Sequence, residues 1–386
     1  MSHKQLFTGI VLIVILVALA ATATMPARAQ DRRLRVVASF SILADVAQSV
    51  AGDAADVASL MPLGTNPHAF TPSAQDVVTL SKANTVLVVG VNFEEGLLPV
   101  VEESAADKMF VVSQCIPIRP VVSRTTHNHE ADHADEHEDE AHEDEGGHDH
   151  HADMSADCAG HYEAIEAAFA MDDHALLNGT LGPLNTLTCG GHDHEADDAN
   201  EGQDDHEHAA GSCDPHVWTD PVNAGLWALM IRDVLAELDP ANADVYAANA
   251  EAYLAELAAL HRDIQTLIDA IPADRRSIVT NHLAFNYFAE RYGLKLVGVV
   301  IPGGSTTSEP SVQEVLTLID TVQEYNVPAI FTETTVSESI AQQIAGETGA
   351  QIVRLYTGSL SQPGDGADTY LNYMRYNAQA IADALK

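Results

Sequence analysis

Basic residues are scarce in this chain of 386 residues: 18 Lys and Arg stand against 57 Asp and Glu, which gives a formal net charge of −39 at pH 7. So acidic a chain is repelled by nucleic acids and by anionic membrane surfaces, and we exclude both as partners. Aromatic residues are also few, at 5%, although apolar residues reach 46%, which is enough for packed cores. The length alone indicates two or three domains.

Long apolar runs are missing beyond the N-terminus, and a membrane-spanning helix needs about 20 such residues. Residues 1–29 are predicted to form a secretory signal peptide: Lys4 supplies positive charge, residues 10–21 an apolar core, and residues 27–29 (Ala-Arg-Ala) a cleavage site. A membrane anchor is the alternative, but the apolar run of residues 9–23 is too short to span a bilayer. No Cys stands at the cleavage point, so no lipid anchor is expected there. The predicted mature protein is soluble and periplasmic, with the signal peptide cleaved near Ala29.

Only four cysteines occur in the chain, Cys115, Cys158, Cys189 and Cys213. They form no C-x-x-C pair, so a zinc-ribbon site is not indicated. An oxidising compartment permits disulfides, and four cysteines allow three pairings. The sequence does not fix the pairing, but one pairing has a geometric rationale: Cys115 with Cys213 and Cys158 with Cys189, because the first pair flanks an acidic insert, residues 127–212, and the second lies within it. Free buried thiols and thiolate metal ligands are the alternatives.

The charge is concentrated in this insert, which holds 25 of the 57 acidic residues, 14 of the 19 histidines and no Lys or Arg. Its His/Asp/Glu tracts, residues 126–147 and 190–210, are too polar to pack and are predicted to be disordered, whereas residues 161–177 show some helical spacing. Imidazoles are mostly neutral at pH 7, so we interpret the insert as a weak collector of several divalent cations rather than a solvating linker. The H-E-x-x-H pattern at residues 129–133 needs a stable helix and is interpreted as chance.

Strand and helix patterns alternate in two blocks outside the insert, which predicts parallel sheets with helices on both faces. The predicted strands are residues 34–40, 57–61, 85–90 and 109–113, then 277–280, 295–301, 329–333 and 351–356. Between the blocks, an apolar stripe from Tyr246 to Ile271 predicts a helix of roughly 28 residues that bridges two lobes. The predicted fold is therefore α/β, with two lobes joined by one long helix. Its parts are an N-terminal lobe (30–126 and 213–240) that carries the disordered insert (127–212), a linking helix (241–271) and a C-terminal lobe (272–386).

Three of the five histidines outside the insert stand at the ends of predicted elements. His68 follows Asn66-Pro67, His216 follows Asp214-Pro215, and His282 follows the first strand of the second lobe. Clefts between α/β lobes, at the carboxyl ends of strands, commonly bind ligands, so all three could face one cleft. Neutral imidazole is the commonest metal ligand, and three His with one further position suit zinc. Three unrelated histidines in turns or cores are the alternative.

The segments around these histidines resemble those of the zinc- and manganese-binding solute-binding proteins of ABC importers, the ZnuA-like family. The motifs are NPHAFTPS at His68, CDPHVWTDP at His216 and VTNHLAFNYFAERYGLKLVG at His282, followed by GGSTTSEPS, AIFTE and TYLNYMRYN. The resemblance covers nearly everything outside the insert. It implies two α/β lobes on one rigid helix, metal ligands at these three histidines, and a His-rich loop where the insert lies. A His at position 282 resembles the zinc branch, because the manganese branch typically has a carboxylate there.

The resemblance also implies a fourth ligand, an Asp in a Leu-Tyr-x-Asp-Ser-Leu loop, but Gly358 stands at that position here. Water, Asp365, Asp368 or an insert residue are the candidates, and we choose Asp365. The function implied is high-affinity capture of periplasmic Zn²⁺, as transported ligand, by a monomer that delivers it to a membrane ABC permease, without enzymatic activity. The alternatives are a zinc hydrolase with Glu333 beside the metal, a periplasmic metal buffer without a permease, and manganese import.

Overall fold

The structure is a computed structural model that describes residues 33–121, 158–171, 176, 180, 182–184, 213–302, 306 and 308–386. The predicted leader with its cleavage point, most of the acidic insert with its H-E-x-x-H pattern, and Cys189 lie outside these residues. Residues 35–386 form one unit, which contains both lobes. No helix in the described ranges has both the length and the apolar character needed to cross a membrane.

The first lobe is built on a sheet with the strand order β2-β1-β3-β4, in which β3 runs parallel to both β1 and β4. The continuous apolar run at β3 is buried throughout, as expected of a strand covered on both faces. After β3 the chain turns through Val91 and Asn92 at positive φ, and the next helix, α4, begins at Leu98. The bounds are β1 Leu34–Ala38, α2 Ser41–Ala51, β2 Ala55–Ser59, α3 Ala74–Lys82, β3 Thr85–Val88, α4 Leu98–Ala105 and β4 Met109–Val111.

The second lobe repeats this plan with a parallel sheet in the order β10-β9-β7-β8. Gly293 and Gly349 end helices α8 and α10 in the left-handed conformation, which glycine adopts without steric cost. The bounds are β7 Ser277–Thr280, α8 Asn286–Tyr292, β8 Lys295–Val299, α9 Val312–Glu324, β9 Ala329–Glu333, α10 Ser339–Thr348, β10 Gln351–Leu355 and α11 Tyr370–Leu385. The two-lobe α/β fold expected from the sequence is confirmed.

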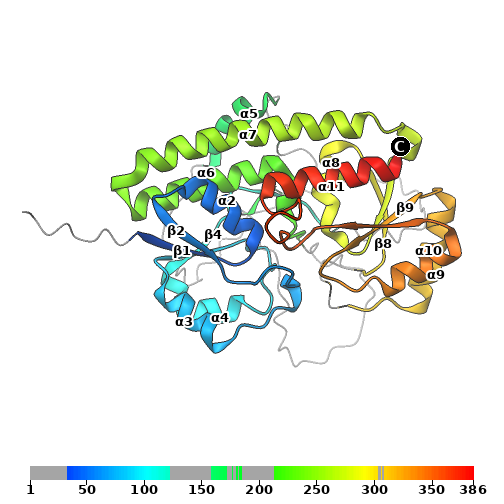
Figure 1. Cartoon of the computed structure of the whole chain (residues 1–386), viewed down its shortest axis with the longest axis horizontal. Coiled ribbons are helices and arrows are strands. Elements are labelled where there is room, and N and C mark those ends of the chain that lie inside the picture. Colours follow the sequence, from blue (N-terminus) through cyan, green and yellow to red (C-terminus); the bar gives the residue numbers. More distant parts are fainter. Residues whose placement is uncertain are drawn as a thin grey trace, which may run out of the picture. The chain divides into compact units, whose positions relative to one another are not determined.

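One long helix, α7 (Ala243–Asp269), connects the lobes, and α6 (Pro221–Leu238) precedes it along the chain, with a short turn between the two. The buried face of α7 follows the predicted apolar stripe, which includes Tyr246, Leu257 and Ile264. This face packs on α6, on α2 of the first lobe and on α8 and α11 of the second (Figure 1). At 27 residues, α7 is about 40 Å long and gives both lobes a common support.

A further helix, α5 (Cys158–Phe169), lies within the insert and overlaps the range where helical spacing indicated an ordered piece. It packs on α6 and α7, and its start forms a disulfide with Cys115 at a Cα–Cα distance of 5.3 Å. The pairing of Cys115 with Cys213 was therefore wrong, because docking of α5 brings Cys158 to Cys115. Cys213 is also disulfide-bonded. Next to Cys115, β5 (Pro117–Ile118) pairs antiparallel with β6 (Gly182–Pro183).

Candidate metal centre

Three buried histidines from three separate turns meet between the lobes. His68 lies in the short helical turn η1 (Pro67–Ala69) beyond β2, and the Asn66 side chain accepts a hydrogen bond from its backbone N–H at 3.2 Å. His216 immediately precedes a second turn, η4 (Val217–Thr219), at the start of the α6 segment. His282 follows the end of β7. The sequence-predicted meeting of these residues between the lobes is thus what the structure shows.

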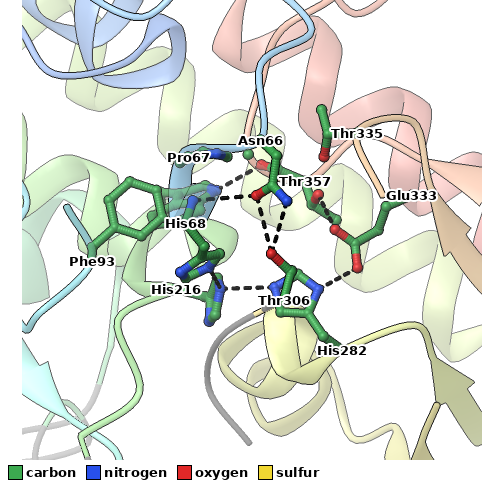
Figure 2. A pocket seen from close by; sticks show the side chains of 12 residues that line it. Asn66, Pro67, His68, Phe93, His216, His282, Thr306, Glu333, Thr335 and Thr357 are labelled. Atoms are coloured by element: carbon green, nitrogen blue, oxygen red, sulfur yellow. Dashed lines mark hydrogen bonds and ion pairs between the residues drawn. The ribbon is translucent and has the colours of Figure 1, made fainter. Parts of the chain in front are cut away.

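The three imidazoles point their Nε2 atoms at one another, as Figure 2 shows. The Nε2 of His216 lies 3.2 Å from that of His68 and 3.0 Å from that of His282, and one ligand atom from each residue falls within 4.8 Å of the others. Zinc–nitrogen bonds of about 2.0–2.1 Å at tetrahedral angles would place nitrogens roughly 3.3 Å apart. Lone pairs facing each other this closely repel unless a proton or a cation lies between them, so the arrangement suits one shared cation.

Each imidazole has a carboxylate at its other nitrogen, Nδ1. For His216 the partner is Asp214, at 2.9 Å, and for His68 it is Glu95, at 3.3 Å. His282 is bound in the same way by Glu333, which also accepts a hydrogen bond from the Thr357 hydroxyl at 2.5 Å. A carboxylate at Nδ1 holds the proton there and leaves the Nε2 lone pair for a metal. The rings are therefore oriented and in the tautomer that ligation requires.

Burial sets the protonation of this site. It lowers the pKa of His216 well below its ordinary value, with a further contribution from the neighbouring His282 and His68, so this imidazole stays neutral at pH 7. Burial also raises the pKa of Asp214 to about 7, partly offset by the hydrogen bond from the His216 backbone N–H. For Glu333, burial opposes ionisation, but the interactions with His282, Thr357 and His216 together outweigh burial and hold the pKa below the usual range. A neutral His216 imidazole and an ionised Glu333 in the same pocket favour the binding of a cation.

The wall of the pocket is aromatic on the side of the first lobe. The Phe93 ring packs edge-on against His68 with centroids 5.4 Å apart, and the Trp218 ring lies 5.4 Å from that of His216. On the opposite side, the Asn66 amide and the Thr306 hydroxyl hydrogen-bond across the lobes at 2.8 Å (Figure 2). The enclosed space is about 10 Å³. This is about the room of a single water molecule, so the pocket fits one small ion and no organic ligand.

The structure does not bring Asp365, the residue predicted as fourth ligand, to this group. Asp365 is exposed in a turn, where its backbone N–H donates to the Gln362 carbonyl, and it does not line the pocket. Asp368, the other candidate from that loop, accepts a hydrogen bond from the Gly364 backbone N–H at 2.9 Å. The loop does reach the pocket, but through Gly358 and Thr357.

Sequence reasoning missed the carboxylates that orient the imidazoles. Asp214 had a signal, since it stands two residues before His216 within the CDPHVW motif. Glu333 was considered only as a catalytic base. It stands at the carboxyl end of β9, just as His282 follows the carboxyl end of the neighbouring strand β7. For Glu95, no pattern in the sequence distinguishes it from the preceding Glu94, which points instead into the first lobe and accepts a hydrogen bond from Ser39.

Comparison with protein families identifies the chain. The model of the family described as "Zinc-uptake complex component A periplasmic" (ZnuA) matches residues 36–175 and 175–384. The chain belongs to this family. ZnuA-family proteins are solute-binding transport proteins and not enzymes, so the hydrolase hypothesis is wrong, and this chain is a metal-binding, substrate-binding protein of the ABC-importer type.

Relatives of this ZnuA-family chain carry names that differ in the metal. The manganese-binding lipoprotein MntA of Halalkalibacterium halodurans is 26% identical over 99% of both chains. The iron-binding protein YfeA of Yersinia pestis is 27% identical over 91% of this chain and 86% of its own. The solved structure of the periplasmic zinc binding protein TroA from Treponema pallidum covers 92% of this chain and 99% of its own, at a TM-score of 0.64 and 21% identity. The last likeness supports the fold alone.

Proposed function

We propose that this protein captures Zn²⁺ in the periplasm with high affinity, through His68, His216 and His282, and delivers it to a membrane ABC permease. The observation that carries the proposal is the convergence of three Nε2 atoms at 3.0 and 3.2 Å, each on a ring whose other nitrogen is held by a carboxylate. Such an arrangement binds a divalent cation without rearranging its ligands, which favours tight binding.

The donor set favours zinc over manganese. Imidazole nitrogens suit zinc, whereas manganese prefers carboxylate and water oxygens. Glu333 is the one carboxylate among the described residues that line the pocket, and its two oxygens are already engaged by His282 and Thr357. The names of the relatives, which include manganese and iron, do not decide the metal, so the argument rests on these ligands.

Delivery requires that the same site release its ion. Bonds between the lobes, such as that from Asn66 to Thr306, would have to break when the permease takes the metal. Protonation of the imidazoles would also lower affinity, because a metal competes with protons for the same nitrogens. We propose that the exported protein acts as a monomer, since the three ligands come from one chain.

The test is a metal titration of the chelator-treated protein, with a chromogenic chelator as competitor. We expect one tight Zn²⁺ site and at least tenfold weaker binding of Mn²⁺ at the same site. Removal of an orienting partner alone costs 10–100-fold in other metal sites, so His216→Ala should lose more than about 100-fold in Zn²⁺ affinity. His261→Ala, which removes an imidazole of α7 outside the pocket lining, is the matched control.

Tight Zn²⁺ binding that survives His216→Ala would refute the assignment of the site. If the wild-type protein instead prefers Mn²⁺ while His216→Ala abolishes binding, the site stands and the metal is wrong. For delivery, uptake of radioactive zinc by cells that carry the permease should depend on the wild-type protein and fail with His216→Ala. Equal uptake with the two proteins would count against delivery to a permease.

A further inference from the structure

Helix α8 of the second lobe binds the start of the segment that carries His216. The buried Tyr287 hydroxyl donates a hydrogen bond to the backbone carbonyl of Asp214 and accepts one from the backbone N–H of Arg119, each at 3.0 Å. The Asp214 carboxylate in turn accepts hydrogen bonds from the backbone N–H and the Nδ1 of His216, at 3.0 and 2.9 Å. A single hydroxyl group of the second lobe thus fixes the residue that orients this imidazole.

The same helix also binds the far end of this segment. Arg291, one turn further along α8, donates a hydrogen bond to the buried Asp220 carboxylate at 2.7 Å, and the Asp220 side chain caps the start of α6. Between the two ends, the backbone carbonyl of Trp218 accepts a hydrogen bond from the Tyr370 hydroxyl of α11 at 2.8 Å. Side chains of the second lobe therefore hold a stretch that the sequence predicted to belong to the first lobe.

The first lobe contacts this stretch by ring packing. The Trp218 ring lies against those of Phe40 and Phe93, with centroids 4.9 and 4.7 Å apart. Apolar packing of this kind is not directional, whereas hydrogen bonds to Asp214 and Asp220 fix both distance and direction. The orientation of the stretch is therefore set largely from the side of the second lobe.

The histidines of the pocket are thus shared unevenly between the lobes. His282 stands directly before the turn η7 (Leu283–Phe285) and α8, so one helix both follows His282 and holds His216. The Nε2 atoms of these two histidines are 3.0 Å apart. His68, by contrast, is held by groups of the first lobe, the Asn66 side chain at its backbone N–H and Glu95 at its Nδ1.

We propose that Tyr287 and Arg291 are positioning residues that hold His216 beside His282 on the second lobe, and that His68 is the ligand withdrawn when the lobes separate. The proposal rests on the proposed zinc-binding function and concerns how the same site gives up its ion. On opening, the ion stays with two imidazoles and loses the third. Its hold on the protein is then weaker, which permits transfer to the permease.

The order of release predicts how the three histidines differ. In His68→Ala, the two remaining imidazoles are held by one lobe, so their geometry does not depend on closure. In His216→Ala and His282→Ala, closure of the lobes has to bring the remaining pair together. Because preorganised ligands bind more tightly, His68→Ala should bind Zn²⁺ at least about fivefold more tightly than either of the other two variants.

The positioning role is tested by Tyr287→Phe, which removes only the hydroxyl group. Competition titration should show about tenfold weaker Zn²⁺ binding than in the wild type, and a similar loss in the His68→Ala background. In the His216→Ala background the loss should be less than about twofold, because the hydroxyl acts through the residue that is gone. Tyr292→Phe is the matched control: it removes a buried hydroxyl of the same helix that lies 3.1 Å from His261 Nδ1, and should leave the affinity unchanged.

A spectroscopic signature separates positioning from a general loss of stability. The visible absorption of Co²⁺-loaded protein reports the geometry of the ligands, and it should change in Tyr287→Phe but not in Tyr292→Phe. Where Tyr287→Phe fails to fold, Arg291 provides the same test from the other end of the segment. Arg291→Lys keeps the charge beside Asp220 and should lose less Zn²⁺ affinity than Arg291→Met.

Three results would overturn the proposal while leaving the proposed function in place. They are an equal loss from Tyr287→Phe with and without His216, an unchanged Co²⁺ spectrum in that variant, and a His68→Ala protein that binds zinc no more tightly than His216→Ala. Failure of the proposed function would show differently, as a wild-type protein without a tight zinc site.

Discussion

His282 and Glu333 are hydrogen-bonded across the carboxyl edge of the second sheet because their strands are in register. Thr280 of β7 pairs with Phe331 of β9, and each residue of the pair lies two positions beyond these partners. Successive positions two apart in a strand point to the same side, so the register itself brings the carboxylate to the imidazole. The sheet thus orients one metal-binding ring directly, which ties the affinity of the site to the fold of the lobe.

The first prediction concerns this pair. Glu333→Ala should weaken Zn²⁺ binding about 10–100-fold, because His282 loses the group that fixes its tautomer and ring orientation. Glu333→Gln should lose less, since the amide carbonyl still accepts the Nδ1–H. Competition titration measures both, with the exposed Glu347→Ala of α10 as control. A folded Glu333→Ala protein that binds zinc as tightly as the wild type would contradict the orienting role.

The second prediction concerns Glu94, which is buried at the carboxyl ends of β1 and β3. It accepts hydrogen bonds from the Ser39 hydroxyl at 2.8 Å and from the backbone N–H groups of Val89 and Gly90 at 2.6 and 3.1 Å. Burial raises its pKa from 4.5 to about 7 despite these donors. The folded protein therefore holds this proton more tightly than the unfolded chain does.

A carboxyl group whose pKa is higher in the folded protein than in the unfolded chain contributes its full stabilisation at pH values below 4.5, the pKa in the unfolded chain. This contribution is lost as the pH rises through about 7, the pKa in the folded protein. The difference amounts to about 3 kcal/mol, so the metal-free protein should lose stability from Glu94 between pH 4.5 and about pH 7. Urea unfolding in the presence of chelator measures this, and Glu94→Gln should flatten the pH profile. An unchanged profile in a folded Glu94→Gln protein would show that Glu94 does not titrate in this window.

The arrangement of the lobes could be predicted because local pattern and fold agree there. Alternating strand and helix patterns, glycine at the ends of α8 and α10, and one apolar stripe along α7 each follow from local physical chemistry. His68 and His282 could be predicted because residues beyond the carboxyl ends of parallel strands gather at one edge, whereas His216, which precedes η4, was indicated by its CDPHVWTDP motif. The parts that depend on contacts between distant segments were harder to predict.

Three misses share that cause. The pairing of Cys115 depends on how α5 docks, which the spacing of the cysteines does not contain. Asp365 was chosen from its nearness in sequence to Gly358, but the turn that holds it leaves it exposed. The hydrogen bond between Tyr287 and Asp214 joins residues 73 positions apart, and only the packing of α8 on this segment shows it.

The third prediction separates the acidic insert from the helix within it. Deletion of residues 127–150 removes an acidic, His-rich tract and leaves α5 with its disulfide to Cys115. The shortened protein should keep the tight Zn²⁺ site and its thermal stability, while calorimetry shows fewer weak Zn²⁺ sites. Phe169→Ala, at the end of α5, should instead lower stability by about 3 kcal/mol without changing the tight affinity. Loss of the tight site on deletion of 127–150 would mean that the insert supplies a ligand.

The fourth prediction compares two glycines in helix interiors, where alanine is ordinarily the better helix former. Gly346 of α10 has open space, so Gly346→Ala should stabilise the protein by about 0.5–1 kcal/mol. Gly225 of α6 lies under α5: a Cβ there would come within 2.7 Å of Ile165 Cδ1 and 3.0 Å of Leu254 Cδ2. Because overpacking a core typically costs 1–3 kcal/mol, Gly225→Ala should destabilise by about 1 kcal/mol after the helix gain is subtracted.

Urea unfolding of the two alanine variants should therefore show changes of opposite sign in the free energy of unfolding. Ile165→Val removes Cδ1, the atom nearest to the new methyl group, so Gly225→Ala should cost less in the Ile165→Val background than in the wild type. Such a result would locate the strain at the contact between α5 and α6. The contrary result is that Gly225→Ala stabilises the protein as much as Gly346→Ala does in both backgrounds. In that case α5 does not pack closely on α6 in solution, and the docking of α5 that explains the Cys115–Cys158 disulfide is contradicted.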